Sequence, residues 1–123
     1  MKLFGTDGIR GKAGVAPLEP ATVARVGEAL VRSLMDGAAP HRFVIGRDTR
    51  ESGEWIEREL ARGLTSGGAQ VVSAGVVPTP AIAYLARTEG FDAGLVISAS
   101  HNPYEDNGIK VFGGSGVKLT EKL

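Results

Sequence analysis

The stretch "AGLVISASHNPYEDNGIKVF", residues 93–112, decides the fold of this chain. It opens with an apolar run of strand length at 93–98 and closes with a second such run at 108–112. Between the runs lie small and polar residues and then an Asn-Gly pair, which predicts a turn. The loop of about nine residues is too short for a crossover helix, so the two strands are expected to pair antiparallel.

The rest of the chain alternates between apolar runs of strand length and amphipathic segments of helix length. Because the strand runs are apolar throughout, helices are expected on both faces of a largely parallel sheet. The predicted fold is therefore α/β, a three-layer α/β/α sandwich with a mixed, mostly parallel sheet. Further strands are expected at residues 2–5, 42–46 and 70–77, and helices at 22–35, 53–66 and from 79 to a stop at Gly90.

Two of the predicted helices carry a clear apolar face. Apolar side chains recur every three or four residues, which places them on the side of the helix that packs against the sheet. In the third helix, Thr79 is expected to be the N-cap and Pro80 the first helical residue. The inner-face residues are Val23, Val26, Leu30 and Leu34 in the first helix and Ile56, Leu60 and Leu64 in the second.

Composition excludes several classes of function. Fourteen basic residues balance fourteen acidic ones, so no global field recruits nucleic acid or an anionic membrane surface. The chain has no cysteine, which rules out disulfides, thiolate metal sites and a thiol nucleophile. The N-terminus does not resemble a signal peptide, and no apolar stretch is long enough to span a bilayer. A cytoplasmic protein with no nucleic-acid and no membrane partner is expected.

The candidate reactive loop, residues 98–103, follows a strand at the edge where α/β sheets bind their ligands. Its small residues let backbone amides approach an anion, and Ser100 offers a hydroxyl. The alternative is an ordinary polar turn that ends at an Asn-Pro pair. A serine-hydrolase G-x-S-x-G frame, a phosphate-binding P-loop and a dinucleotide fingerprint are all absent from the sequence. The two histidines, His41 and His101, lie too far apart in sequence to indicate a histidine-based metal site.

A glycine-rich stretch near the N-terminus, "GTDGIRG" at residues 5–11, predicts a turn suited to binding an anion. Its polar residues are Thr6, Asp7 and Arg10, and arginine makes planar, bidentate contacts with phosphate. The alternative is a structural turn with no ligand.

A second charged stretch, "GRDTR" at residues 46–50, ends a predicted strand with Arg47 and Asp48. Arg47 is a candidate phosphate-binding residue. The alternative is a structural ion pair that organises the start of the helix that follows.

Lys110 lies within the last predicted strand. Side chains alternate along a strand, so Ile109 and Val111 share one face and Lys110 lies opposite them with Phe112. A lysine on an exposed edge strand commonly discourages aggregation, and that is the alternative here. The functional interpretation directs Lys110 back toward the Ser100 loop through a turn at Asn107-Gly108.

Four motifs together carry a resemblance to a known family. "FGTDGIRG", "GRDTRESG", "PTPAIAYL" and "ISASHNPYEDNGIK" occur in the order in which they occur in the α-D-phosphohexomutase superfamily, and the likeness runs from Leu3 to about Leu119. The resemblance implies that residues 1–123 are a single domain, the first of four in a longer enzyme. The final "LTEKL", which is typical of a helix that is beginning, agrees with a chain that continues.

The resemblance also implies a reaction. Ser100 would carry a phosphoryl group, pass it to a hexose phosphate and recover the other phosphoryl group from the bisphosphate intermediate, so that a 6-phosphosugar becomes a 1-phosphosugar. The motifs are most similar to those of members that act on glucosamine phosphate. Glucose or mannose phosphate is an alternative substrate, and a non-catalytic α/β binding module is an alternative function.

Several residues receive roles from the resemblance. Lys110 would transfer a proton to and from the sugar hydroxyl, and Arg10 would supply positive charge. His101 and Asn102 would orient the loop or donate hydrogen bonds to the transferring oxygens. The predicted catalytic residues are Ser100, Lys110, His101 and Arg10, and the predicted substrate- or phosphate-binding residues are Thr6, Asp7, Asn102 and Arg47.

The implied cofactor is Mg²⁺, with a hexosamine bisphosphate as activator. The ion would be held by the phosphate on Ser100 and by three aspartates of a second-domain Asp-Gly-Asp loop, a motif that this sequence lacks. The implied partners are a hexosamine phosphate substrate and the remaining domains of the same enzyme. Alone, the chain is expected to be inactive, and exposure of its interdomain surface favours self-association.

Overall fold

A five-stranded sheet forms the centre of the computed structural model, which describes residues 9–15, 18–34, 41–99 and 102–113. The strands lie in the order β1-β5-β4-β2-β3. Strands β4, β2 and β3 run parallel, whereas β5 is antiparallel to both β4 and β1. The strands are β1 (Ile9–Lys12), β2 (Arg42–Arg47), β3 (Gln70–Val76), β4 (Ala93–Ile97) and β5 (Asp106–Gly113), and the helices are α1 (Pro20–Leu34), α2 (Gly53–Ser66) and α3 (Thr79–Thr88).

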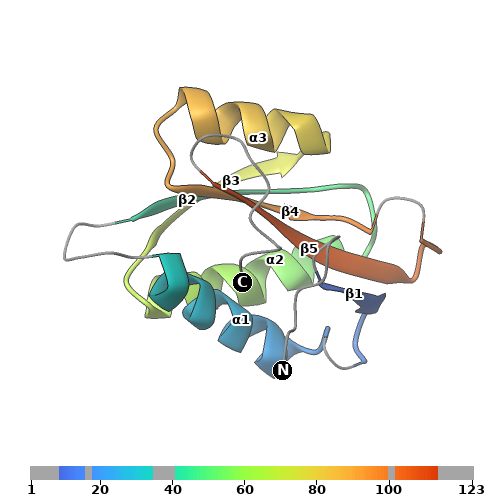
Figure 1. The fold of residues 1–123 in the computed structure, drawn as a ribbon. Coiled ribbons are helices and arrows are strands. Elements are labelled where there is room, and N and C mark those ends of the chain that lie inside the picture. The colour runs from blue at the N-terminus through green and yellow to red at the C-terminus, as the bar shows by residue number, and fades with distance from the viewer. Residues whose placement is uncertain (1–8, 16–17, 35–40, 100–101, 114–123) are drawn as a thin grey trace.

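Helices cover both faces of the sheet (Figure 1), with α1 and α2 on one side and α3 on the other. Each face has its own apolar core, because the strand side chains alternate between the two sides. The predicted α/β/α sandwich with a mixed sheet is confirmed, as is the antiparallel return from β4 to β5. The predicted inner-face residues of the first two helices are buried, except that the side chain of Leu34 lies outside the described residues.

Glycines let the layers approach closely. On the α3 side, Ile82 fills the space above β2 and β4, where a Cβ atom on Gly46 or Gly94 would come within 2.6 or 2.7 Å of it. On the other side, α1 and α2 cross so tightly that a Cβ on Gly63 would lie 1.9 Å from the Ala24 carbonyl oxygen. The first set of contacts packs α3 on β2 and β4, and the second packs α1 against α2.

The sequence interpretation was wrong at the N-terminal edge of the sheet. Residues Ile9–Lys12 form β1, although 9–11 were predicted as part of a turn, because Ile9 is buried in the core and the segment pairs with β5. The strand predicted at 2–5 and the helix predicted to begin at the C-terminus lie outside the described residues.

Two predicted turn and cap positions were also wrong. Asn107 and Gly108 do not form a turn: both lie in β5, where they pair with Gly11 and Arg10 of β1. Pro78, with extended backbone, is the N-cap of α3, so Thr79 is the first helical residue rather than the cap. None of the helices in the described ranges is long and apolar enough to cross a membrane.

Candidate active site

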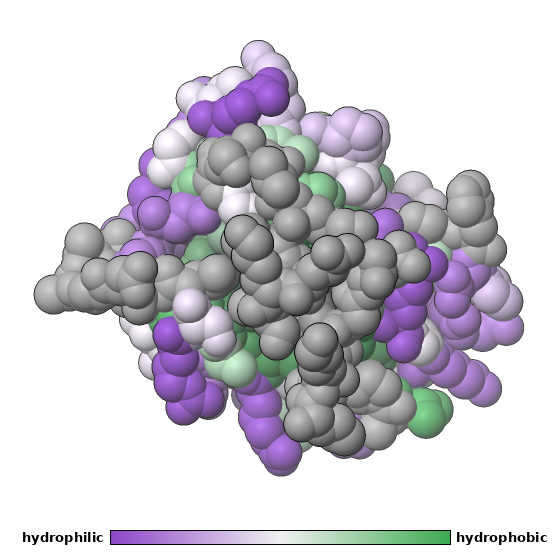
Figure 2. All heavy atoms as spheres, in the orientation of Figure 1, coloured by the Kyte–Doolittle hydropathy of each residue, from purple (hydrophilic) through white to green (hydrophobic). Residues whose placement is uncertain are grey.

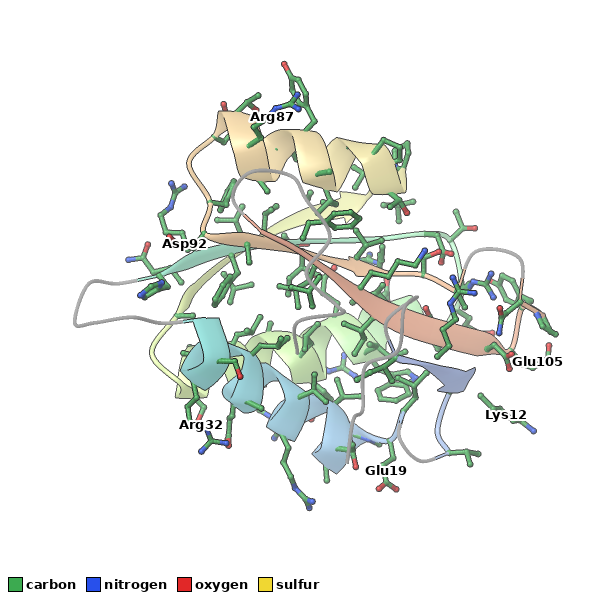
Figure 3. All side chains as sticks on the ribbon, in the orientation of Figure 1. Lys12, Glu19, Arg32, Arg87, Asp92 and Glu105 are labelled. Carbon is green, nitrogen blue, oxygen red and sulfur yellow. The ribbon has the colours of Figure 1, made fainter. Side chains whose placement is uncertain are left out.

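Two loops meet at the carboxyl ends of β2 and β4. Because these strands are parallel neighbours, the loop after β2 and the loop after β4 leave the sheet side by side, and the Asp48 amide donates to the Ile97 carbonyl at 3.1 Å. In Figure 3, Lys12 of β1 and Glu105 of the β4–β5 loop lie at this end, and Asp92 lies at the opposite end. Figure 2 shows hydrophilic residues gathered at the same end. The arrangement gives a polar edge where ligands of α/β sheets bind.

Arg50 lies at the centre of this edge and is only 8% exposed. Its Nη1 donates to three backbone carbonyl oxygens of the β4–β5 segment: Asn102 at 3.1 Å, Pro103 at 2.7 Å and Asp106 at 3.1 Å. Its Nε donates to Oδ2 of Asp48 at 3.0 Å. A single side chain from the β2–α2 loop therefore bonds to the backbone of the segment that leads into β5.

Asp48 holds the other end of the same loop. Its Oδ2 accepts a hydrogen bond from the Ser98 hydroxyl at 2.8 Å, and its Oδ1 accepts one from the backbone amide of Arg50 at 3.0 Å. Ser98 is buried, with 6% of its surface exposed, and its amide donates to the Gly108 carbonyl at 3.0 Å. The Ser98 hydroxyl therefore has a structural partner within the fold.

Arg10 reaches the loop from β1. Its guanidinium Nη1 donates to Oδ1 of Asn102 at 3.1 Å, and Nδ2 of Asn102 donates to Asp106 at 3.1 Å. Arg10 Nε is buried and has no hydrogen-bond partner among the described residues. The stem of Arg10 passes over Gly108, where a Cβ would lie 3.0 Å from Arg10 Cγ. Gly108 is thus required for this close approach rather than for a turn.

Lys110 lies on the same side of the sheet as Arg10. Ile109 and Val111 belong to the core under α1 and α2, whereas Phe112 packs with the core under α3. Alternation therefore directs Lys110, which is half-buried, to the α3 side. Gly108, two residues before it, is the register partner of Arg10, so the two cations come from neighbouring positions of adjacent strands.

Arg47 pairs with carboxylates of α2 rather than with the β4–β5 loop. Its Nη1 lies 2.8 Å from Oε1 of Glu57, and its Nη2 lies 3.8 Å from Glu54, both on α2. The second carboxylate oxygen of Glu57 accepts a hydrogen bond from the Ser73 hydroxyl at 2.8 Å. This is the ion pair at the helix start that was the alternative for Arg47, and a phosphate-binding role for it stays a prediction.

The described residues bring together Arg10 and Asn102, with Lys110 on the same side of the sheet. Four other predicted site residues, Thr6, Asp7, Ser100 and His101, lie outside the described residues. Sequence reasoning missed Arg50. Its signal was the spacing Asp-x-Arg directly after a buried strand, which lets the Asp48 carboxylate bond both the amide and the guanidinium of Arg50.

No cluster of three or more His, Asp or Glu side chains suited to a metal ion occurs in the described part of the chain. Two carboxylates at this edge are already engaged: Asp48 with Ser98 and Arg50, and Asp106 with Asn102. These residues alone do not form a metal site.

Comparison with known proteins identifies the class. The family model described as "Phosphoglucomutase/phosphomannomutase, alpha/beta/alpha domain I" matches residues 1–123, and the chain belongs to this family. Among solved structures, a putative phosphomannomutase from Thermus thermophilus is similar with a TM-score of 0.82 and 34% identity, over 92% of this chain and 26% of that one. A phosphoglucomutase/phosphomannomutase family protein from Burkholderia thailandensis has a TM-score of 0.76 and 32% identity, over 94% of this chain and 26% of that one.

Two curated relatives of high identity to this chain carry one name. A phosphoglucosamine mutase of Koribacter versatilis is 58% identical over 99% of this chain, and one of Solibacter usitatus is 59% identical over 97%. The aligned region is 26% and 27% of those two proteins, so the chain spans about a quarter of the length of the relatives it matches.

Replacing Gly108 by alanine is expected to lower the free energy of unfolding by about 1–3 kcal/mol, the usual cost of overpacking. The added Cβ would lie 2.6 Å from the Ile9 carbonyl oxygen and 2.9 Å from the Ser98 carbonyl oxygen, both backbone atoms that cannot rotate away. Urea unfolding followed by circular dichroism measures the change, with Thr49→Ala, in an exposed part of the neighbouring loop, as the control. Equal stability of Gly108→Ala and wild type would contradict the close approach.

Proposed function

We propose that this chain is the phosphoserine-bearing first domain of a four-domain phosphoglucosamine mutase. The complete enzyme would interconvert glucosamine 6-phosphate and glucosamine 1-phosphate. The proposal is supported by family membership over the whole chain and by identities of 58% and 59% to proteins of that name. The chain spans about a quarter of those relatives, so catalysis requires the remaining domains as partners. A cytoplasmic location is proposed with it, in keeping with a sequence that has no cysteine.

In the proposed reaction, a sugar hydroxyl attacks the phosphorus atom carried by Ser100. The bond between phosphorus and Ser100 Oγ breaks, and a bond between phosphorus and the sugar oxygen forms. Lys110, as the neutral amine, accepts the proton of the attacking hydroxyl, and the departing Ser100 oxygen takes up a proton from solvent. After the bisphosphate has reoriented, Ser100 loses its proton as it attacks the other phosphoryl group, and protonated Lys110 returns its proton to the departing sugar oxygen. Phosphoryl transfer depends chiefly on positioning and charge neutralisation, so the cationic groups beside the loop matter most.

The observation that carries the proposal is the unpartnered Nε–H of Arg10. A buried N–H without a partner costs about 1–3 kcal/mol, which a ligand can recover by accepting its hydrogen bond. The same guanidinium is held beside the loop by Asn102, only two residues after Ser100. A phosphate oxygen is the acceptor that best suits a fixed guanidinium, because the pairing is planar and charge-assisted.

A second candidate is a phosphomannomutase or phosphoglucomutase, favoured by the names of the two solved structures. Those structures are 34% and 32% identical to this chain, well below the 58% and 59% of the phosphoglucosamine mutases. Glucosamine phosphate is therefore the proposed substrate. A non-catalytic binding module is the remaining alternative.

The proposed magnesium ion would take one ligand from this chain, the phosphate on Ser100. The engaged carboxylates of Asp48 and Asp106 agree with a metal site completed from outside the chain. When bound, the ion would neutralise charge on the transferring phosphoryl group.

Incubation of the full-length enzyme with radiolabelled glucosamine 1,6-bisphosphate is expected to place one phosphoryl group on Ser100. The neighbouring Ser98 should stay unlabelled, because its buried hydroxyl is bonded to Asp48. Peptide mapping by mass spectrometry locates the label, and Ser100→Ala provides the control. A label on Ser98, or no label in an active preparation, is the result that excludes the assignment.

Substituting Lys110 by methionine in the full-length enzyme is expected to lower kcat by at least about 10²-fold, because the sugar hydroxyl loses its proton acceptor. The matched control is Lys12→Met, an exposed lysine on β1 two positions from Arg10. Steady-state kinetics of both variants, with circular dichroism to verify folding, give the comparison. If Lys110→Met kept the kcat of Lys12→Met, Lys110 would be a structural strand residue.

A further inference from the structure

We propose that Asp48 and Arg50 act together as positioning residues for phosphoryl transfer, and we call this pair the Asp48–Arg50 clamp. The clamp would fix the backbone on both sides of Ser100 so that its phosphoryl group meets the sugar hydroxyl in line. The inference rests on the proposed function, because it assigns these residues to the same reaction. Neither residue touches the reacting atoms in this interpretation.

The first argument is that the clamp binds the loop on both sides of Ser100. Before Ser100, the Ser98 hydroxyl donates to Asp48 at 2.8 Å. After Ser100, the carbonyl oxygens of Asn102, Pro103 and Asp106 accept from Arg50 at 2.7 to 3.1 Å. The two halves are joined by the 3.0 Å bond from Arg50 Nε to Asp48 Oδ2. A shift of either residue therefore moves the backbone on at least one side of Ser100.

The second argument is the burial of the charge. Arg50 is 8% exposed, and removing a guanidinium from water is unfavourable unless its N–H groups are bonded and its charge is neutralised. Asp48 supplies the opposite charge, and the loop carbonyls supply the acceptors. An arginine that served only the solubility of the protein would be exposed rather than buried. Holding a buried cation against three carbonyl groups instead specifies one loop conformation.

The third argument comes from the sequence positions that the clamp joins. Arg50 lies 52 to 56 residues before its carbonyl partners, so no local turn preference accounts for these bonds. Tyr104 adds a second long-range bond between the same two segments, since its hydroxyl donates to the Thr49 carbonyl at 2.8 Å. The loop is thus bonded to residues 48–50 both through the Arg50 side chain and through the Tyr104 hydroxyl.

Lysine cannot replace Arg50 in this role. It keeps the positive charge, but its single ammonium group cannot serve Asp48 and three carbonyls with the planar fork of a guanidinium. Misplacement of a reacting group by about 1 Å can cost about 10² in rate. The effect should appear in kcat, because the substrate-binding groups of the other domains are untouched.

The test uses the full-length enzyme and two variants, Arg50→Lys and Asp48→Asn, with Arg58→Lys as the matched control on the exposed face of α2. Wild type is first tested for a label on Ser100 and for turnover of glucosamine phosphate. Failure there would refute the proposed function itself. With that established, Arg50→Lys is expected to lower kcat by about 10-fold to 10²-fold, with an unchanged KM and an unchanged circular dichroism spectrum. Single-turnover transfer of the label from Ser100 to sugar should slow by the same factor.

Two results would overturn the clamp while the proposed function stands. One is a wild-type kcat in both folded variants. The other is a loss of activity that only matches the fraction of unfolded protein. If Arg50→Lys does not fold, Asp48→Asn decides: a folded variant with reduced kcat supports the clamp, and one with wild-type kcat contradicts it. If neither variant folds, the pair is structural only and the inference fails.

Discussion

The buried guanidinium of Arg50 is the constraint on which the polar edge of this sheet depends. Its charge is costly to remove from water unless an opposite charge and several acceptors are supplied, and the fold supplies Asp48 and three backbone carbonyls of residues 102–106. To meet this requirement, the loop after β4 must fold back over the loop after β2. The parallel pairing of these strands brings the two loops to the same end of the sheet. Topology and electrostatics therefore specify the same loop conformation.

Glycines make that conformation sterically possible. Gly46 and Gly94 let Ile82 of α3 pack directly on β2 and β4, the two strands that lead into the loops. Gly108 leaves room for the stem of Arg10 to cross β5 and reach Asn102. Two guanidinium groups thus lie at this edge: Arg50, bonded to backbone carbonyls of residues 102–106, and Arg10 of β1, whose Nε has no hydrogen-bond partner among the described residues.

Much of the fold could be predicted from the sequence because its signals are local. The α2 helix has its predicted bounds of 53–66, since its apolar face and its Gly67-Gly68 stop depend only on neighbouring residues. The β1 strand could not be predicted, because Ile9–Lys12 becomes a strand only by pairing with β5 about a hundred residues later. The Asn107-Gly108 pair predicted a turn because the local pattern does not show that these residues pair with β1.

The candidate site divides in the same way. Asn102 and Arg10 could be proposed from motifs, and the described structure brings them into contact. The Asp-x-Arg spacing indicated a bond between Arg50 and Asp48 but not the burial of Arg50, because a polar loop before a helix suggests an exposed arginine. Its burial follows from the return of residues 102–106, which no local pattern encodes.

The most direct test of this account is a crystal structure of the full-length enzyme with Ser100 phosphorylated. Arg50 Nη1 is expected to lie within hydrogen-bond distance of the carbonyl oxygens of Asn102, Pro103 and Asp106, and Arg50 Nε within hydrogen-bond distance of Asp48. A guanidinium of Arg50 turned to solvent, or bound to the phosphate instead of the loop carbonyls, would contradict it.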